Sequence, residues 1–173
     1  MTRRVLAMPL LCIAAACSTP GLPVPDQLKP PAGESPIAAL TARGVQIYEC
    51  RARTDDAQAS EWAFVAPQAE LFDAGGRPVG KHYAGPHWES SDGSKVIGSV
   101  KARADAPQPG AIPWLLLATR SDGPAGAFAG VTSVQRVNTA GGTAPAAAEC
   151  AAATRGREAR VAYSAEYLLF GSR

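Results

Sequence analysis

Bulky side chains alternate with small or polar ones along the C-terminal part of the chain. At every second position this segment carries a bulky or apolar residue: Val161, Tyr163, Ala165, Tyr167 and Leu169. Successive side chains of a β-strand point to opposite faces, so this spacing predicts a strand with one buried face.

Shorter runs of the same kind recur along the chain, at residues 45–51, 62–65, 96–100 and 131–137. After Pro113, residues 114–117 are continuously apolar, which predicts a strand that is buried on both faces. Glycine-containing turns separate the runs, at residues 74–76, 91–94, 122–123 and 140–143. The pattern predicts an all-β, single-domain antiparallel sandwich or barrel.

Two segments could add short helical turns to this β-domain. They are Ser35–Arg43, where we expect one or two turns, and the alanine-rich Ala146–Thr154. Neither segment is long enough for the crossover helix of a βαβ unit, so a doubly wound parallel sheet is disfavoured.

The N-terminal residues have the features of a secretory signal. Arg3 and Arg4 precede an apolar run from Val5 to Ala16, which is shorter than the roughly 20 residues of a membrane-spanning helix. Small residues then precede Cys17, as in the lipobox of bacterial lipoproteins. We therefore expect residues 1–16 to be a signal peptide and Cys17 to carry a lipid that anchors an outer-membrane lipoprotein facing the periplasm. Ordinary cleavage after Ala16 is the alternative, and it would leave a soluble periplasmic or secreted protein.

A proline-rich stretch follows the predicted anchor. Because proline favours extended backbone, residues 17–36 are expected to form the anchor cysteine and a tether, and residues 37–173 a single domain. The full sequence has 17 Lys and Arg against 15 Asp and Glu, so loss of Arg3 and Arg4 leaves a neutral protein. With no cluster of basic and aromatic residues, a nucleic-acid partner is not expected.

The cysteine count predicts one disulfide. Cys12 leaves with the signal peptide and Cys17 takes the lipid, so Cys50 and Cys150 remain in an oxidising compartment, where pairing is the usual outcome. Two separately buried thiols are the alternative.

Residues 81–92 hold the densest set of candidate functional side chains, including both histidines of the chain. Trp88 offers an aromatic face for an apolar molecule or a glycan, and histidine titrates near neutral pH. The candidate ligand-binding residues are His82, Tyr83, His87, Trp88, Glu89 and Asp92.

A metal- or histidine-dependent envelope enzyme centred on His82 is the alternative function. If the sequence Gly85-Pro86 bends the chain tightly, His82 and His87 could converge on a metal, with Glu89, Asp92 or Asp73 as the third ligand. No known metal motif, nucleophile elbow or dinucleotide fingerprint accompanies them, so no cofactor is expected and a binding domain is favoured over an enzyme.

Several motifs along the chain carry a family resemblance. The most specific are Gly44-Val45-Gln46-Ile47-Tyr48-Glu49-Cys50, Gly80-x-His82-Tyr83-x-Gly85-Pro86-x-Trp88, Ile112-Pro113-Trp114-Leu115-Leu116-Leu117 and Val134-Gln135-Arg136-Val137. In their order they resemble the DUF3455 family, exported bacterial and fungal proteins without an established function, over about residues 37–170.

The resemblance implies an all-β domain and a Cys50–Cys150 bridge, and it brings no catalytic residue. Some fungal relatives carry a malate dehydrogenase label, which the absent nucleotide fingerprint does not support. His87 stands where a small hydroxylated residue is expected in relatives, which weighs against a two-histidine metal site. We therefore expect a cell-envelope domain that binds a small molecule, a glycan or an envelope partner.

Overall fold

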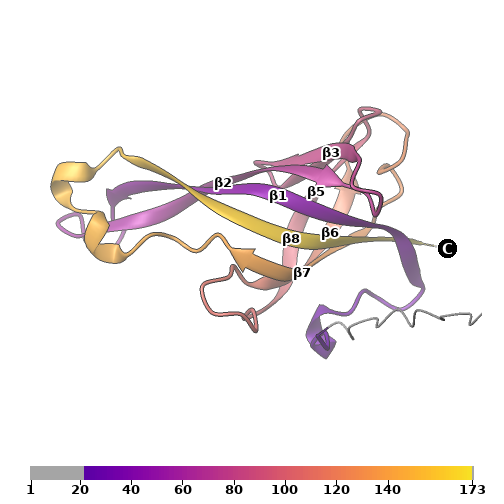
Figure 1. Ribbon diagram of the computed structural model, residues 1–173, viewed down its shortest axis with the longest axis horizontal. Coiled ribbons are helices and arrows are strands. Elements are labelled where there is room, and N and C mark those ends of the chain that lie inside the picture. The colour runs from indigo at the N-terminus through magenta and orange to yellow at the C-terminus, as the bar shows by residue number, and fades with distance from the viewer. Residues whose placement is uncertain (1–21, 173) are drawn as a thin grey trace, which may run out of the picture.

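Eight antiparallel strands close into a barrel in simple chain order. The computed structural model describes residues 22–172, in which each strand pairs with the next and β8 pairs back with β1 (Figure 1). The strands are β1 (Glu34–Ala52), β2 (Ser60–Phe72), β3 (Pro78–Tyr83), β4 (His87–Ser90), β5 (Lys95–Ala104), β6 (Trp114–Ser121), β7 (Ser133–Gly141) and β8 (Glu158–Ser172). This confirms the predicted all-β antiparallel domain and selects the barrel over the sandwich.

The helical turns expected for Ser35–Arg43 are a wrong prediction, because these residues form the first half of β1. They pair with the C-terminal half of β8, and Leu40 and Ala42 pack into the core. Pairing along the whole of β8 decides the conformation of a segment whose own sequence is ambiguous. Residues 146–154 do contain two single 3₁₀ turns, η2 (Ala147–Glu149) and η3 (Ala152–Thr154).

The barrel interior is filled by the inward-facing residues of all strands. Trp88 and Tyr167 are the largest of them. Tyr163, Ala165 and Leu169 of β8 lie in the same core, as their alternation predicts, whereas Val161 is only partly buried and lies outside it. Gly98 on β5 makes room for Trp88, since a Cβ atom there would lie 2.8 Å from Cζ3 of the indole ring. Burial of these side chains is the main stabilising contribution.

A second apolar cluster lies on the outside of the barrel, beneath the N-terminal segment. The single 3₁₀ turn η1 (Asp26–Leu28) places Leu28 against Trp114, Leu116 and Val137. The Gln135 amide donates a hydrogen bond to the carbonyl of Leu28, over 2.6 Å. Part of the predicted tether is therefore packed on the barrel, and this explains why the run after Pro113 is apolar on both faces.

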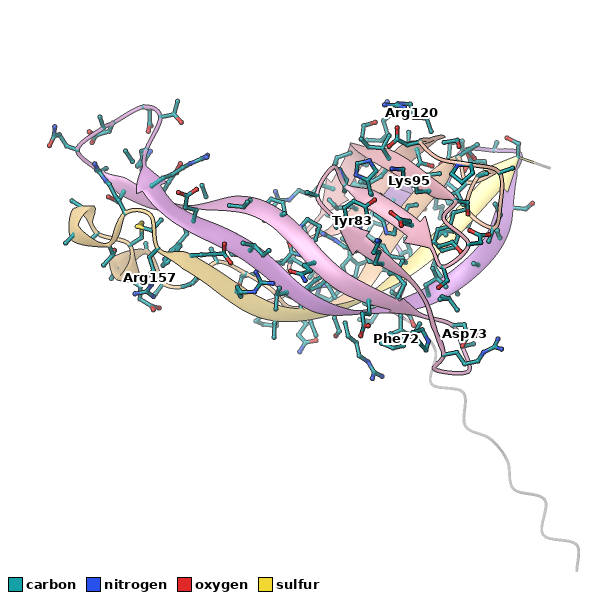
Figure 2. The ribbon with its side chains drawn as sticks, turned by 90° about the horizontal axis from the view of Figure 1, so that it is seen from above. Phe72, Asp73, Tyr83, Lys95, Arg120 and Arg157 are labelled. Atoms are coloured by element: carbon teal, nitrogen blue, oxygen red, sulfur yellow. A yellow bond between two sulfur atoms is a disulfide. The ribbon has the colours of Figure 1, made fainter. Side chains whose placement is uncertain are left out.

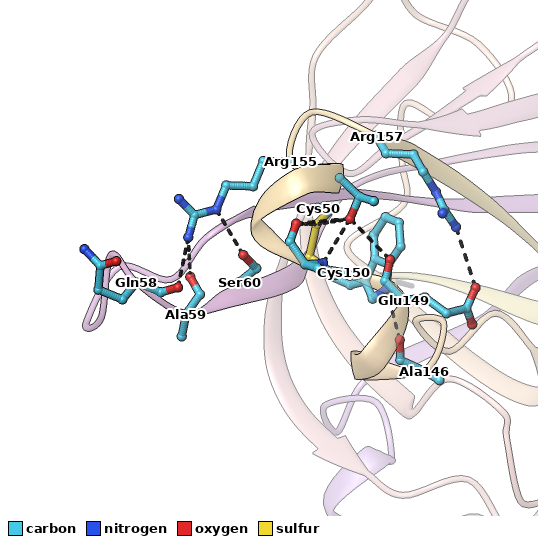
Figure 3. The surroundings of a disulfide bond; sticks show 12 residues. Cys50, Gln58, Ala59, Ser60, Ala146, Glu149, Cys150, Arg155 and Arg157 are labelled. Carbon is cyan, nitrogen blue, oxygen red and sulfur yellow. Dashed lines mark hydrogen bonds and ion pairs between the residues drawn. A yellow bond between two sulfur atoms is a disulfide. The ribbon is translucent and has the colours of Figure 1, made fainter.

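Strands β1, β2 and β8 continue beyond the ring as a twisted three-stranded extension, which we call the arm (residues 45–52, 60–68 and 158–162; Figure 1). At its tip the disulfide joins Cys50 of β1 to Cys150, between η2 and η3 (Figure 3). The predicted disulfide is thus confirmed.

Arginine side chains hold the tip of the arm around the disulfide. Arg155 donates hydrogen bonds to the carbonyls of residues 57–59, and Arg157 pairs with Glu149 (Figure 3). The indole of Trp62 donates to the carbonyl of Ala146. These contacts tie the β1–β2 turn to the long connection between β7 and β8.

Candidate functional site

The barrel encloses a cavity of about 580 Å³ that opens beneath the arm, at the end where β3 meets β4 and β5 leads into β6. We call it the cup. It is within the size range of small-molecule sites, about 300–1,000 Å³. Its lining residues are Gln46, Tyr48, Phe64, Val65, Pro67, His82, Ala84, Gly85, Pro86, Trp88, Val100, Arg103, Ile112, Pro113, Leu115, Leu117, Arg136 and Tyr167.

Two β-bulges shape the mouth of the cup. On β2, Val65 has no partner on β1, since Ala66 pairs with Ile47 and Phe64 with Tyr48. A bulge lets two neighbouring side chains face the same side of a sheet, so Phe64 and Val65 both line the cup. A second bulge, at residue 101 of β5, turns Arg103 toward the same opening.

Aromatic rings meet in the inner part of the cup. The His82 imidazole stacks on the Trp88 indole, with ring centroids 4.4 Å apart, and the two residues face each other across β3 and β4. Tyr167 of β8 closes the group, at 5.0 Å from His82 and 5.5 Å from Trp88. This cluster offers flat, largely apolar surfaces to a ligand.

His82 is held in one neutral form. Its Nδ1 lies 2.7 Å from the backbone carbonyl of His87, so Nδ1 must carry the hydrogen and donate it. Burial lowers the pKa of His82 to about 3; the hydrogen bond to the His87 carbonyl opposes this shift, and the charges of Arg136 and His87 add to it. Nε2 is therefore a hydrogen-bond acceptor at neutral pH, and no residue of the described chain donates to it.

Two buried donors of the cup have no hydrogen-bond partner among the described residues. They are Nε2 of Gln46, a residue that is 3% exposed, and the indole Nε1 of Trp88. Gln46 is near enough to Tyr163 to lower the pKa of that phenol, against a larger upward effect of burial, yet its amide nitrogen remains unpaired. Buried polar groups are normally satisfied, and Trp114 Nε1 and Glu34 Oε2 are two further exceptions within residues 22–172 that lie outside the cup.

Arginines supply the charge of the cup. Arg136 of β7 donates two hydrogen bonds to the Pro113 carbonyl, from Nε and Nη2. Burial raises the pKa of Tyr167, and Arg136 opposes that rise because its guanidinium lies close to the Tyr167 hydroxyl. Arg103 lies at the exposed mouth, and neither Asp nor Glu is among the lining residues.

The structure separates the residues that the sequence analysis grouped as a site. His82 and Trp88 line the cup, whereas Tyr83, His87 and Glu89 lie on the outer side of the same hairpin. Tyr83, which is labelled in Figure 2, donates a hydrogen bond to Glu89 that raises the pKa of Tyr83 to about 12, and its ring stacks on that of His87.

His87 contacts two acceptors, and both lie away from His82. Its Nδ1 lies 2.6 Å from the Ala84 carbonyl and its Nε2 3.0 Å from Asp122. The bend at the sequence Gly85-Pro86 is present, but it does not bring the two histidines onto one ligand. Within residues 22–172 no three His, Cys, Asp or Glu side chains are grouped so that they could hold a metal ion.

Asp92 organises the opposite end of the barrel. Its carboxylate accepts hydrogen bonds from the Ser94 hydroxyl and from the Ala127 amide, and these hold its pKa well below the usual range. The contact folds the glycine-rich loop over that end, where Phe128 is buried. Asp92 is thus placed to hold a loop and does not line the cup.

Sequence reasoning missed Gln46, Arg136 and Tyr167 as site residues. They come from β1, β7 and β8, far from residues 81–92 along the chain. Gln46 and Arg136 carry a signal in retrospect, because each is a polar residue at an inward position of a strand whose other inward neighbours are apolar.

No helix in the part of the chain that the structure describes is long and apolar enough to cross a membrane. The chain matches no curated protein and no solved structure. Residues 31–171, most of the described domain, match the model of DUF3455, a family described as proteins of unknown function. The match covers every strand of the barrel as well as the cup, and the chain belongs to the DUF3455 family.

Proposed function

We propose that the protein binds a small, largely apolar molecule in the cup. The observation that carries this proposal is the cavity of about 580 Å³, whose lining brings together the rings of His82, Trp88 and Tyr167 with Arg136. A site of this kind, mostly apolar with a few converging polar groups, is the usual form of a small-molecule site.

The mouth of the cup supports the same function. Phe64, Val65 and Val100 are each more than half exposed, at 53%, 53% and 57%. They are three of the five large hydrophobic residues exposed in the described chain, and all three line the opening. An apolar rim of this kind favours entry of an apolar molecule.

The separation of the histidines favours binding over the alternative of a metal- or histidine-dependent enzyme. His82 lies inside the barrel with Nδ1 donated to a backbone carbonyl, and His87 lies outside, engaged with Ala84 and Asp122. A general base must accept a proton from the reacting group. With a pKa of about 3, His82 is a weak proton acceptor.

Binding can be tested with N-phenyl-1-naphthylamine, a neutral apolar probe that fluoresces in apolar surroundings. We expect the wild-type protein to bind it with saturation. Val100→Trp places an indole at the mouth of the cup and should abolish binding or weaken it at least about tenfold, the loss of roughly 1.4 kcal/mol.

Ile37→Trp is the matched control, since Ile37 is a similarly exposed apolar residue of β1 that does not line the cup. This variant should bind the probe like the wild type. Equal binding by both tryptophan variants, or no saturable binding by the wild type, would refute the proposed function.

We also propose that the domain works in the cell envelope, held there by a lipid on Cys17. Cys17 and the signal sequence before it lie outside the described residues. The proposal is supported by the basic–apolar–small pattern ahead of Cys17 and by a disulfide, which is typical of exported proteins. Mass spectrometry of the mature N-terminus should find a diacylated or triacylated cysteine, and an unmodified residue there would exclude the anchor.

A further inference from the structure

We propose that the cup selects an organic anion, namely an apolar body that carries one carboxylate. This inference rests on the proposed function and adds the chemical class of the ligand. Three observations carry it: the charge of the lining, the hydrogen-bonding capacity that Arg136 has left, and the apolar surfaces of the inner wall.

The lining is positively charged and holds no counter-charge. Arg136 and Arg103 are among the residues of the cup, and none of the others is acidic. No ion pair within residues 22–172 involves either arginine. A half-buried guanidinium without an anion is an uncompensated charge, so an anionic ligand would gain from both Coulomb attraction and hydrogen bonding.

Arg136 has hydrogen-bonding capacity left over. Its Nε and Nη2 are used by the Pro113 carbonyl, at 3.0 and 2.8 Å, which fixes the plane of the guanidinium. Nη1 is not used by the Pro113 carbonyl, and the guanidinium also lies close enough to the Tyr167 hydroxyl to oppose the rise that burial causes in the pKa of that phenol. A guanidinium held rigidly in this way loses little side-chain entropy when a carboxylate binds to the remaining nitrogen.

The unpaired groups on the buried walls are mainly donors. Gln46 Nε2 and Trp88 Nε1 both carry hydrogens, and an ionised carboxylate is acceptor-only. His82 Nε2 is an acceptor and does not add to the preference. An alcohol offers no charge to Arg136, whereas a carboxylate offers both a negative charge and two acceptor oxygens.

The body of the ligand faces apolar surfaces. The rings of His82, Trp88 and Tyr167 form the inner wall, and Leu115 and Leu117 lie on the β6 side. Aliphatic and aromatic bodies both suit these surfaces, so the shared chemistry is the carboxylate on an apolar group.

The test uses two matched series of probes and isothermal titration calorimetry. The aromatic series is 2-naphthoate, 2-naphthalenemethanol and 2-naphthylmethylammonium, and the aliphatic series is octanoate, octan-1-ol and octylammonium. Within each series the body is constant and only the head group changes. We expect the carboxylate to bind at least about tenfold more tightly than the alcohol, and the ammonium ion to bind most weakly.

Variants assign the preference to the cup. Arg136→Gln should reduce the affinity for 2-naphthoate about tenfold or more while leaving 2-naphthalenemethanol within about twofold, and Arg136→Lys should retain part of the preference. Arg103→Gln removes a charge at the exposed mouth without disturbing a buried contact, and it should reduce the preference by a smaller factor. Arg51→Gln is the control, because Arg51 is exposed on β1 outside the lining.

The outcomes separate this inference from the function on which it rests. Equal affinity for the carboxylate and the alcohol, or a carboxylate preference that survives both Arg136→Gln and Arg103→Gln, would overturn the anion preference and leave binding in the cup intact. Failure of all six probes, together with failure of the neutral naphthylamine probe, would overturn the proposed function itself. A loss of preference in Arg51→Gln equal to that in Arg136→Gln would show a general charge effect and also overturn the inference.

Discussion

At the residue scale, the chemistry of the β3–β4 hairpin follows from the face of the sheet that each side chain occupies. His82 and Trp88 face each other across the two strands and point into the barrel, whereas Tyr83 and His87 form the next pair and point outward. The two pairs are neighbours, yet the imidazole of His82 is buried and neutral, whereas that of His87 contacts the carboxylate of Asp122. These residues are close together in the sequence and were therefore predicted to form one site, but alternate side chains of a strand point to opposite faces of the sheet.

His82 should make the protein less stable in acid. Its pKa in the folded state is about 3, below the ordinary 6.5, so below about pH 6.5 the unfolded chain binds a proton that the folded protein does not. The free energy of unfolding should then fall by about 1.4 kcal/mol per pH unit from this residue, until the pH approaches 3.

Urea denaturation of wild type and His82→Gln at several pH values measures this contribution. The glutamine amide can still donate to the His87 carbonyl but does not titrate. The difference in stability between the two proteins should shrink as the pH falls from 7 toward 4, and a difference that is constant with pH would contradict the buried neutral histidine.

Gly98 should tolerate no side chain. A Cβ atom there would lie 2.8 Å from the Trp88 ring and 3.3 Å from Leu117, both packed in the core. Gly98→Ala should lower the free energy of unfolding by about 1–3 kcal/mol, the usual cost of overpacking. Gly130→Ala is the control, because a Cβ atom there meets nothing within 4 Å. Equal stability of the two variants in urea denaturation would show that the indole does not lie against β5.

At the scale of the elements, most strands were predicted from the sequence. The prediction failed for segments whose conformation depends only on pairing with another strand. The alternation in β8 and the apolar run of β6 were sufficient to place those strands and their faces. The half of β1 before residue 44 was not recognised, since its small and mixed residues show no clear period and it becomes a strand only by pairing with β8. The proline-rich segment is a similar case. Leu28 is buried against Trp114, Leu116 and Val137 on the outside of the barrel, and the sequence around Leu28 does not predict this contact.

The packing of η1 on the barrel predicts a difference between two leucines of the N-terminal segment. Leu28 is fully buried against Trp114, and Leu22 is 55% exposed. Leu28→Ala should lower the free energy of unfolding by about 2–5 kcal/mol, as large-to-small changes in cores do. Leu22→Ala should change it by less than about 0.5 kcal/mol. Similar values for both variants in urea denaturation would contradict docking of this segment.

The disulfide should be a large contributor to stability. It closes a loop with a sequence separation of 100 residues, for which the chain-entropy model gives up to about 4.7 kcal/mol. Cys50→Ser together with Cys150→Ser should lower the midpoint of thermal unfolding, and reduction of the wild type should bring it to the same value. An unchanged midpoint would show that the arm tip contributes little to the fold.

At the scale of the whole molecule, closure of the barrel creates the site. Gln46, Arg136 and Tyr167 come from three strands that lie together only when β8 pairs with both β1 and β7. The histidine and tryptophan of the hairpin could be selected from the sequence as unusual residues, but the wall opposite them required the order and register of all eight strands. The cup is thus a property of the tertiary fold, with the arm as part of its opening.

The most direct test of binding in the cup is to follow the three tryptophan indole N–H signals by NMR during titration with 2-naphthoate. Trp88 lines the cup with an unpaired N–H, Trp114 lies in the outer cluster, and Trp62 lies on the arm against Arg157. Ligand in the cup should shift the Trp88 signal strongly and saturably while leaving that of Trp114 almost unchanged. A saturable shift of Trp62 or Trp114 with no change at Trp88 would show that the ligand binds elsewhere and would contradict the account.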